Sequence, residues 1–325
     1  MPCRLCLCSV ILSAALLPGA LAAADDSAEL RLRIAPNEVQ RYAWTITATS
    51  DSRGNEKGRP FVLTGDSAFT MTLVLRGLPA KPGVKTDKTR VAARIQDLSY
   101  SDKRAVDTAK TELTVSKGRI KCVENGKVVM DSENDIGLDR LVDYQQHIKS
   151  IENGEMRATL DAAGRQSEVE GEPALVDTLK GGGAEGIFPI LSARETKVGE
   201  SWEDSFSMTR IGDFKLARPA VVRSKMTFAK WVTRDDKKLA QLEIASAWDN
   251  QPLKGEHPEG LLVEITSIEG RGEGTCLFDP ATGRFVEGAV NFGMKYHVTG
   301  EREGQTTALD VAGKTRFSFA AQPGR

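Results

Sequence analysis

The sequence predicts a mainly β protein of the α+β class, with two curved antiparallel β-sheet halves and one or two central helices between or beneath them. Apolar side chains occupy every second position in several segments, most regularly in residues 290–298, which is the pattern of strands with one buried face. The alternate positions are polar, so one face meets water, and this favours antiparallel strands over a parallel sheet clad in helices. Helical periodicity is limited to positions 135–180.

The N-terminus has the three parts of a secretory signal peptide. Arg4 is basic, residues 10–17 are apolar, and small residues at positions 20–24 provide a cleavage site. A membrane-spanning helix needs about 20 apolar residues. Pro18 ends the apolar run before it reaches this length. We therefore expect residues 1–24 to be removed, which leaves no membrane span and a soluble protein in the periplasm or outside the cell.

Size and charge narrow the range of functions. The 325 residues, 40% of them hydrophobic, can form one large or two ordinary domains without metals or disulfides. The 44 basic and 45 acidic residues give a net charge of −1. Nucleic acids are not expected as partners, because surfaces that bind them are strongly basic.

Two of the five cysteines remain after cleavage, Cys122 and Cys276. They form either one disulfide, as an oxidising compartment allows, or two buried thiols. The other three precede the cleavage site, so none of them is placed to carry a lipid anchor.

Residues 25–186 are expected to form the N-terminal β-rich half. Its clearest strand covers residues 69–75, where Phe69 and every second residue after it are apolar. Residues 51–60, rich in Gly, Ser, Asn and charge, predict a solvated loop. The remaining expected elements are a strand, turn and strand within 29–48, a loop at 79–88, and strands at 91–100 and 112–115.

Helices are predicted only near the end of this half. The first has Asp135 as its candidate N-cap and ends at Asn153 and Gly154. A hairpin over residues 156–170 follows, and then a short helix with Pro173 in its first turn. The apolar face of the first helix carries Leu138, Leu141, Val142 and Ile148.

Residues 187–325 are expected to form the C-terminal β-rich half, and the stretch from 187 to 206 leads into it. Pro189 prevents a preceding helix from continuing. Gly199 predicts a turn, and the strand after it is expected to bury Trp202 in the core. Both halves begin with an aromatic-bearing strand and end with a cysteine before a hairpin turn. This shared order is consistent either with an internal duplication or with accidental similarity between β-rich segments.

The phrase Phe188-Pro189-Ile190-Leu191, a short gap and Val198-Gly199-Glu200-Ser201-Trp202 resembles an uncharacterised group of secreted bacterial β-rich proteins. These share F-P-x-L followed by V-G-D/E-x-W, with Asp more common where this chain has Glu200. The layout is also similar to periplasmic lipoprotein carriers, in which a curved antiparallel sheet wraps helices and holds acyl chains. The resemblance implies the fold and an envelope location, and it supplies no catalytic residue.

Motifs for phosphate binding and nucleophilic catalysis are incomplete. Gly181, Gly183 and Gly186 match a dinucleotide-binding spacing, but a helix precedes them where a strand is required. Gly65-Asp66-Ser67 lacks the second glycine of a nucleophile elbow. These stretches are interpreted as a linker and part of a strand.

Acid–base and metal motifs are also incomplete. His147, His257 and His297 are expected on the surface, because none has a triad context. Asp131, Glu133 and Asp135 alternate like calcium ligands, but the loop lacks the bidentate glutamate, so an acidic helix start is the preferred interpretation. Four tryptophans, Trp44, Trp202, Trp231 and Trp248, are interpreted as core rather than as the lining of a cleft.

The sequence therefore predicts no catalytic, cofactor-binding or metal-binding residue and no cofactor. Its preferred interpretation is a non-enzymatic extracytoplasmic module that binds or carries an apolar small molecule, or binds an envelope protein. The alternative is a secreted hydrolase with a carboxylate-based site, since spacing in sequence does not report the distance between two carboxylates. Phe69 and Phe292 are expected to point inward, where an apolar ligand would contact them.

Overall fold

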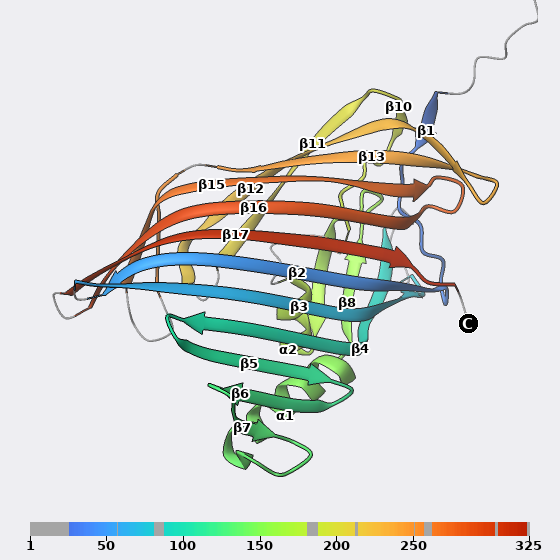
Figure 1. Ribbon diagram of the computed structural model, residues 1–325. Helices are drawn as coiled ribbons and strands as arrows, with labels where there is room; N and C mark the ends of the chain where they lie inside the picture. The colour runs from blue at the N-terminus through green and yellow to red at the C-terminus, as the bar shows by residue number, and fades with distance from the viewer. Residues whose placement is uncertain are drawn as a thin grey trace, which may run out of the picture.

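One antiparallel sheet of fifteen strands dominates the fold of the described residues (Figure 1). The computed structural model describes residues 26–56, 58–80, 88–180, 188–211, 214–249, 251–256, 262–302 and 305–323. Within these ranges a two-stranded sheet and two helices accompany the large sheet. The prediction of a mainly β protein with antiparallel strands is therefore confirmed.

The main sheet is built from long strands, most of which pair with their neighbours in sequence. Its strands are β2 (Val39–Glu56), β3 (Arg59–Leu78), β4 (Thr89–Val106), β5 (Ala109–Ser116), β6 (Arg119–Glu124), β7 (Lys127–Asp131), β8 (Met156–Leu160), β9 (Gln166–Gly171), β11 (Ser201–Ile211), β12 (Phe214–Arg234), β13 (Lys237–Trp248), β14 (Leu253–Glu256), β15 (Leu262–Asp279), β16 (Arg284–Arg302) and β17 (Gln305–Ala321). The order across the sheet is β11-β12-β13-β15-β16-β17-β2-β3-β4-β5-β6-β7. Off this path, β14 pairs with β12 and β15, and the β8–β9 hairpin pairs with β4.

The two halves of the chain share this single sheet. Strand β17 pairs with β2 from Thr307 opposite Glu56 to Ala321 opposite Tyr42. The expectation of two separate sheet halves is not confirmed, because the C-terminal strand satisfies the backbone hydrogen bonds along the edge of β2 that would otherwise be open. In Figure 1 the red strand β17 lies directly beside the blue strand β2, so the strands of the C-terminal half and those of the N-terminal half form one continuous sheet.

The prediction of a loop at residues 51–60 is wrong. Strand β2 continues to Glu56 and β3 begins at Arg59, and these two residues are register partners. Strand β2 lies between β17 and β3 and is hydrogen-bonded on both sides. These ladders outweigh the low strand propensity of Gly, Ser and Asn, since propensity in strands depends strongly on context.

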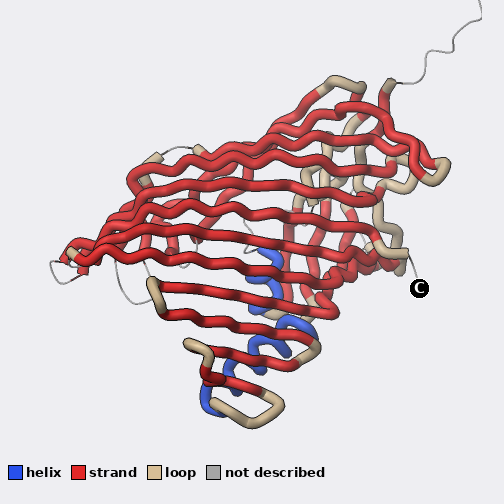
Figure 2. The backbone as a smooth tube through the Cα atoms, in the orientation of Figure 1, coloured by secondary structure: helices blue, strands red, loops and turns tan. Residues whose placement is uncertain are grey.

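A smaller layer covers one face of the main sheet. Helices α1 (Leu138–Asn153) and α2 (Pro173–Lys180) lie on this side, behind the strands in the view of Figure 2. Strands β1 (Ser27–Glu29) and β10 (Glu195–Lys197) pair with each other there. We call this covered side, which carries Trp44, Phe292 and Phe319, the inner face.

Both helices lie where the sequence predicts them, but the predicted N-cap is wrong. Gly137 is the N-cap of α1, in the left-handed region at φ 69°, and no side chain caps the helix. The carboxylate of Asp131 accepts hydrogen bonds from the backbone N–H of Glu133 and the side-chain amide of Asn134. This acidic side chain therefore organises the turn before the helix, which leaves Asp135 outside the capping position.

The apolar core lies on the inner face in three clusters. The largest fills the space between the sheet and the covering layer and includes Tyr42, Leu73, Phe228 and Phe278. A second cluster forms under β14, around Trp248. In the third, α1 packs its Leu141 against β5, β6 and β7.

The stretch after residue 187 crosses the inner face before the chain enters the sheet. Gly199 forms the predicted turn at φ 87°, and β11 starts at Ser201. Trp202 is half-buried rather than fully buried, and its indole N–H donates a hydrogen bond of 2.8 Å to the carbonyl of Ile190. Its position is therefore fixed by a polar contact as well as by packing.

Trp202→Phe is expected to lower the free energy of unfolding by about 1 kcal/mol, because the ring contact remains while the carbonyl of Ile190 loses its donor. Urea denaturation of the two proteins measures the difference. The matched control is Trp231→Phe, because the Trp231 indole N–H makes no hydrogen bond in the described structure. Equal losses in both variants would contradict the structural role of the Trp202 hydrogen bond.

Candidate functional site

An apolar pocket lies on the inner face, between the sheet and the segment that crosses it. Its volume is about 200 Å³. Strands β11, β12, β13, β15, β16, β17 and β2 form its floor, and residues 188–190 contribute from the covering layer. Its lining consists of Trp44, Phe188, Pro189, Ile190, Asp204, Phe206, Ser224, Met226, Ile244, Ser246, Thr275, Cys276, Ala289, Val290, Phe292, Phe317 and Phe319.

An aromatic cluster borders this pocket and contributes Trp44, Phe188 and Phe319 to its lining. The ring of Phe188 lies 4.6 Å from that of Tyr42, 5.0 Å from that of Phe285 and 5.2 Å from that of Phe319, measured between centroids. Its centroid is 5.9 Å from that of Trp44. The first residue of the F-P-x-L phrase therefore anchors the crossing segment on the sheet and positions Pro189 and Ile190 over the pocket.

The floor of the pocket depends on a glycine at an inner position of β15. Gly274 lies between Ile244 of β13 and Val290 of β16 in the register of the sheet. A Cβ atom at this position would lie 2.3 Å from the carbonyl oxygen of Ala289 and 2.7 Å from Cα of Val290. Only glycine therefore lets the two neighbouring strands approach here and lets Ile244 and Val290 line the cavity.

A short polar row interrupts the apolar lining. Asp204 on β11 is opposite Ser224 on β12, and Ser224 is opposite Ser246 on β13. The two serine hydroxyls are 2.7 Å apart and hydrogen-bonded. Arg165, from the turn of the β8–β9 hairpin, donates to Oδ1 of Asp204 through Nη2 at 2.9 Å and through Nε at 3.3 Å.

The two cysteines in the described part of the chain are buried free thiols, so of the two alternatives the structure shows the thiols and not the disulfide. Cys276 lies in the pocket floor, and burial raises its pKa to about 12. The thiol is therefore protonated at neutral pH, and it contributes to the pocket as a small apolar group.

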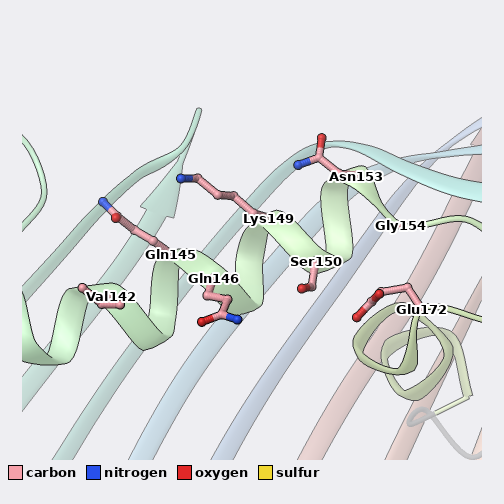
Figure 3. A pocket seen from close by; sticks show the side chains of 8 residues that line it. All are labelled: Val142, Gln145, Gln146, Lys149, Ser150, Asn153, Gly154 and Glu172. Atoms are coloured by element: carbon pink, nitrogen blue, oxygen red, sulfur yellow. The ribbon is translucent and has the colours of Figure 1, made fainter.

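A second depression lies along α1, beside Gly154 and Glu172, and most of its lining residues have polar side chains (Figure 3). Its volume is about 490 Å³. In Figure 3 Lys149 and Asn153 point away from Glu172, so these polar groups do not converge on one point. We do not assign a binding site there. Its lining is Val142, Gln145, Gln146, Lys149, Ser150, Asn153, Gly154 and Glu172.

A serine, a histidine and an aspartate lie in one row on the opposite, outer face of the sheet. Ser267, His297 and Asp310 are register partners on β15, β16 and β17, and His297 Nδ1 is 2.6 Å from Asp310 Oδ1. The Asp310 side chain is 77% exposed, unlike the buried carboxylate of a catalytic triad. Among the described residues, no hydrogen bond joins Ser267 to the ring, so this row is not assigned as a hydrolytic site.

The other sequence motifs are scattered over the molecule. His147 is exposed on α1 and His297 lies on the outer face, both on the surface as predicted, while His257 and the three glycines between 181 and 186 lie outside the described residues. Gly65 to Ser67 form part of β3. No group of acidic, histidine or cysteine side chains in the described ranges could hold a metal ion.

Of the candidate cleft residues, the structure brings Trp44 and Phe292 to the pocket. Trp202, Trp231 and Phe69 pack against the main core, and Trp248 belongs to the second core cluster, as the core interpretation predicts. Sequence reasoning missed the row of Asp204, Ser224 and Ser246. The only available signal was a polar residue at an inward position of an alternating strand, which becomes visible once the strand register is known.

Comparison with known proteins identifies no relative. No family model matches the chain, and no curated protein matches it. Within the described residues, no helix has the length and apolar character needed to span a bilayer.

Among solved structures, an outer membrane channel from Pseudomonas putida F1 is similar at 6% identity and a TM-score of 0.22, over 90% of this chain and 98% of that one. The translocator domain of the autotransporter NalP from Neisseria meningitidis is similar at 7% identity and a TM-score of 0.17, over 85% of this chain and 88% of that one. OccK7 of Pseudomonas aeruginosa is similar at 6% identity and a TM-score of 0.18, over 87% of this chain and 99% of that one. TM-scores of this size do not indicate a shared fold, and these likenesses support no functional conclusion.

Proposed function

We propose that the protein is a non-enzymatic extracytoplasmic module that binds or carries a small molecule with an apolar part, held in the pocket on the inner face. The signal-peptide pattern in residues 1–24 supports a location in the periplasm or outside the cell. The resemblance in layout to lipoprotein carriers supports the same reading.

The observation that carries this proposal is the composition of the pocket. Most of its lining is apolar or aromatic, with a few polar groups on one side, which is the usual character of a small-molecule site. At about 200 Å³ the cavity is smaller than the roughly 300–1,000 Å³ of pockets that enclose whole drug-sized ligands. It suits the apolar part of a ligand whose remaining atoms lie outside.

The polar groups of the pocket favour binding over hydrolysis. Glycoside hydrolysis needs two carboxyl groups about 5–10 Å apart, and Asp204 is the single carboxylate among the described lining residues. That carboxylate is already paired with Arg165. A protein partner at the envelope is the other candidate, and absence of small-molecule binding would favour it.

Val290→Trp is expected to block the pocket, because the larger side chain projects from the floor into the cavity. The neutral apolar probe N-phenyl-1-naphthylamine, whose fluorescence rises in apolar surroundings, should bind the native protein saturably and bind this variant at least about tenfold more weakly. Fluorescence titration gives both dissociation constants. Val290→Phe is a smaller filling variant, for use if the tryptophan prevents folding.

The matched control is Val62→Trp, the same substitution at an exposed position of β3. It should leave probe binding unchanged. Circular dichroism of each variant establishes that the β fold persists. Equal binding by the native protein, Val290→Trp and Val62→Trp would place the probe elsewhere and contradict the proposal, and so would the absence of saturable binding.

A further inference from the structure

The polar row of the pocket has an unused capacity to accept hydrogen bonds. Both bonds from Arg165 go to the same oxygen of Asp204, Oδ1. No hydrogen bond to Oδ2 is present among the described residues, although a carboxylate oxygen can accept two. Asp204 lines the pocket, so this oxygen is available to a ligand there.

The adjacent serines supply a complementary donor. One hydroxyl of the Ser224–Ser246 pair donates to the other, which leaves the hydrogen of the second hydroxyl free to bond elsewhere. The row therefore offers one strong charged acceptor and one neutral donor side by side, a combination that a hydroxyl or primary amide group satisfies.

The charge of the site excludes an acidic head group. The described lining contains no lysine or arginine, and the nearby Arg165 is already paired with Asp204 at 2.9 Å. A carboxylate head would lie beside the carboxylate of Asp204 without a free cation, and like charges at such distances repel. A neutral head meets no such penalty.

We infer that the pocket selects ligands with an unbranched apolar chain and a neutral head that donates a hydrogen bond, with Asp204 as the residue that determines specificity. This inference rests on the proposed function. The cavity of about 200 Å³ accommodates roughly six or seven methylene groups if each needs about the 30 Å³ of a water molecule. A straight-chain alcohol of octyl length is the simplest ligand of this class.

Three octyl-sized competitors of the probe N-phenyl-1-naphthylamine test the inference at neutral pH. They are 1-octanol, its isomer 1-methoxyheptane, which accepts hydrogen bonds but cannot donate one, and octanoate, which is ionised. Octanol should displace the probe at about tenfold lower concentration than the ether, because a hydrogen bond to a charged acceptor contributes about one such factor or more. Octanoate should be the weakest competitor.

Any apolar pocket favours a neutral ligand over an ion, so the native protein alone does not test the role of Asp204. Asp204→Asn tests it directly. The variant lacks the charged acceptor and releases Arg165. The preference for octanol over the ether should fall to below about threefold, and octanoate should compete at least about fivefold better than with the native protein. Asp66→Asn, at an exposed position of β3, is the control and should retain the native order.

The double variant Ser224→Ala with Ser246→Ala provides a second readout that removes the donor and keeps the Arg165–Asp204 pair. It should weaken both octanol and the ether severalfold, because both accept a hydrogen bond, and the preference for octanol should remain because Asp204 is intact. The inference is overturned if octanol and the ether compete equally with the native protein, or if Asp204→Asn leaves the order of the three competitors unaltered while the probe still binds. Failure of the probe itself to bind the native protein overturns the proposed function, and the inference with it.

Discussion

Phe188→Ala is expected to lower the free energy of unfolding by about 3–5 kcal/mol, the range for removing a large aromatic side chain from a packed core. The Phe188 ring is buried against Tyr42, Phe285 and Phe319, and nothing on the covering layer replaces it. Its loss leaves a cavity and releases the segment that lies over the pocket. Urea denaturation followed by tryptophan fluorescence measures the change.

Two further variants interpret that result. Phe188→Leu retains most of the volume and should cost clearly less than Phe188→Ala. Val142→Ala, at a position 58% exposed on α1, should change stability by no more than about 0.5 kcal/mol. A loss below about 1 kcal/mol for Phe188→Ala would show that the F-P-x-L phrase does not anchor the covering layer.

Gly274→Ala is expected to destabilise the protein by about 2–3 kcal/mol, at the upper part of the range for overpacking. The added methyl group would meet the backbone of β16, which cannot move away as a side chain can. Because Ile244 and Val290 lie on either side of this glycine and line the pocket, probe binding should weaken as well. Thermal unfolding and fluorescence titration report the two effects.

Gly293→Ala is the matched control on the neighbouring strand β16. A Cβ atom there has no heavy atom within 4 Å. The substitution should be neutral or stabilise the protein by about 0.4–1 kcal/mol, because alanine restricts the unfolded chain. If the two alanine variants had the same stability, close packing of β15 against β16 would not explain the glycine at 274.

Much of the fold could be predicted from local pattern. The alternation in residues 290–298 places β16 correctly, and its apolar side chains lie on the inner face. The apolar spacing around Leu141 and the proline at 173 locate both helices. These predictions are correct because each depends only on residues a few positions apart and on burial of one face.

Features that depend on distant partners could not be predicted. Residues 51–56 have the composition of a loop and form a strand because β17 and β3 pair with them. The joining of both halves into one sheet has the same origin. For the pocket, local pattern places Phe292 inward, but the meeting of Phe188 with Trp44 and of Asp204 with Ser224 requires the register of the whole sheet.

The pairing of β2 with β17 also affects how the protein folds. Ser318 donates a hydrogen bond to the carbonyl of Thr45, across 273 residues of chain. During synthesis, β2 emerges long before its partner, and contacts of such separation form slowly because a large loop must close first. Until then the open edge of β2 is a template for pairing with other chains. Assembly of the native sheet therefore requires synthesis of β17 (Gln305–Ala321), and proteins truncated before this strand should aggregate rather than persist as a folded N-terminal half.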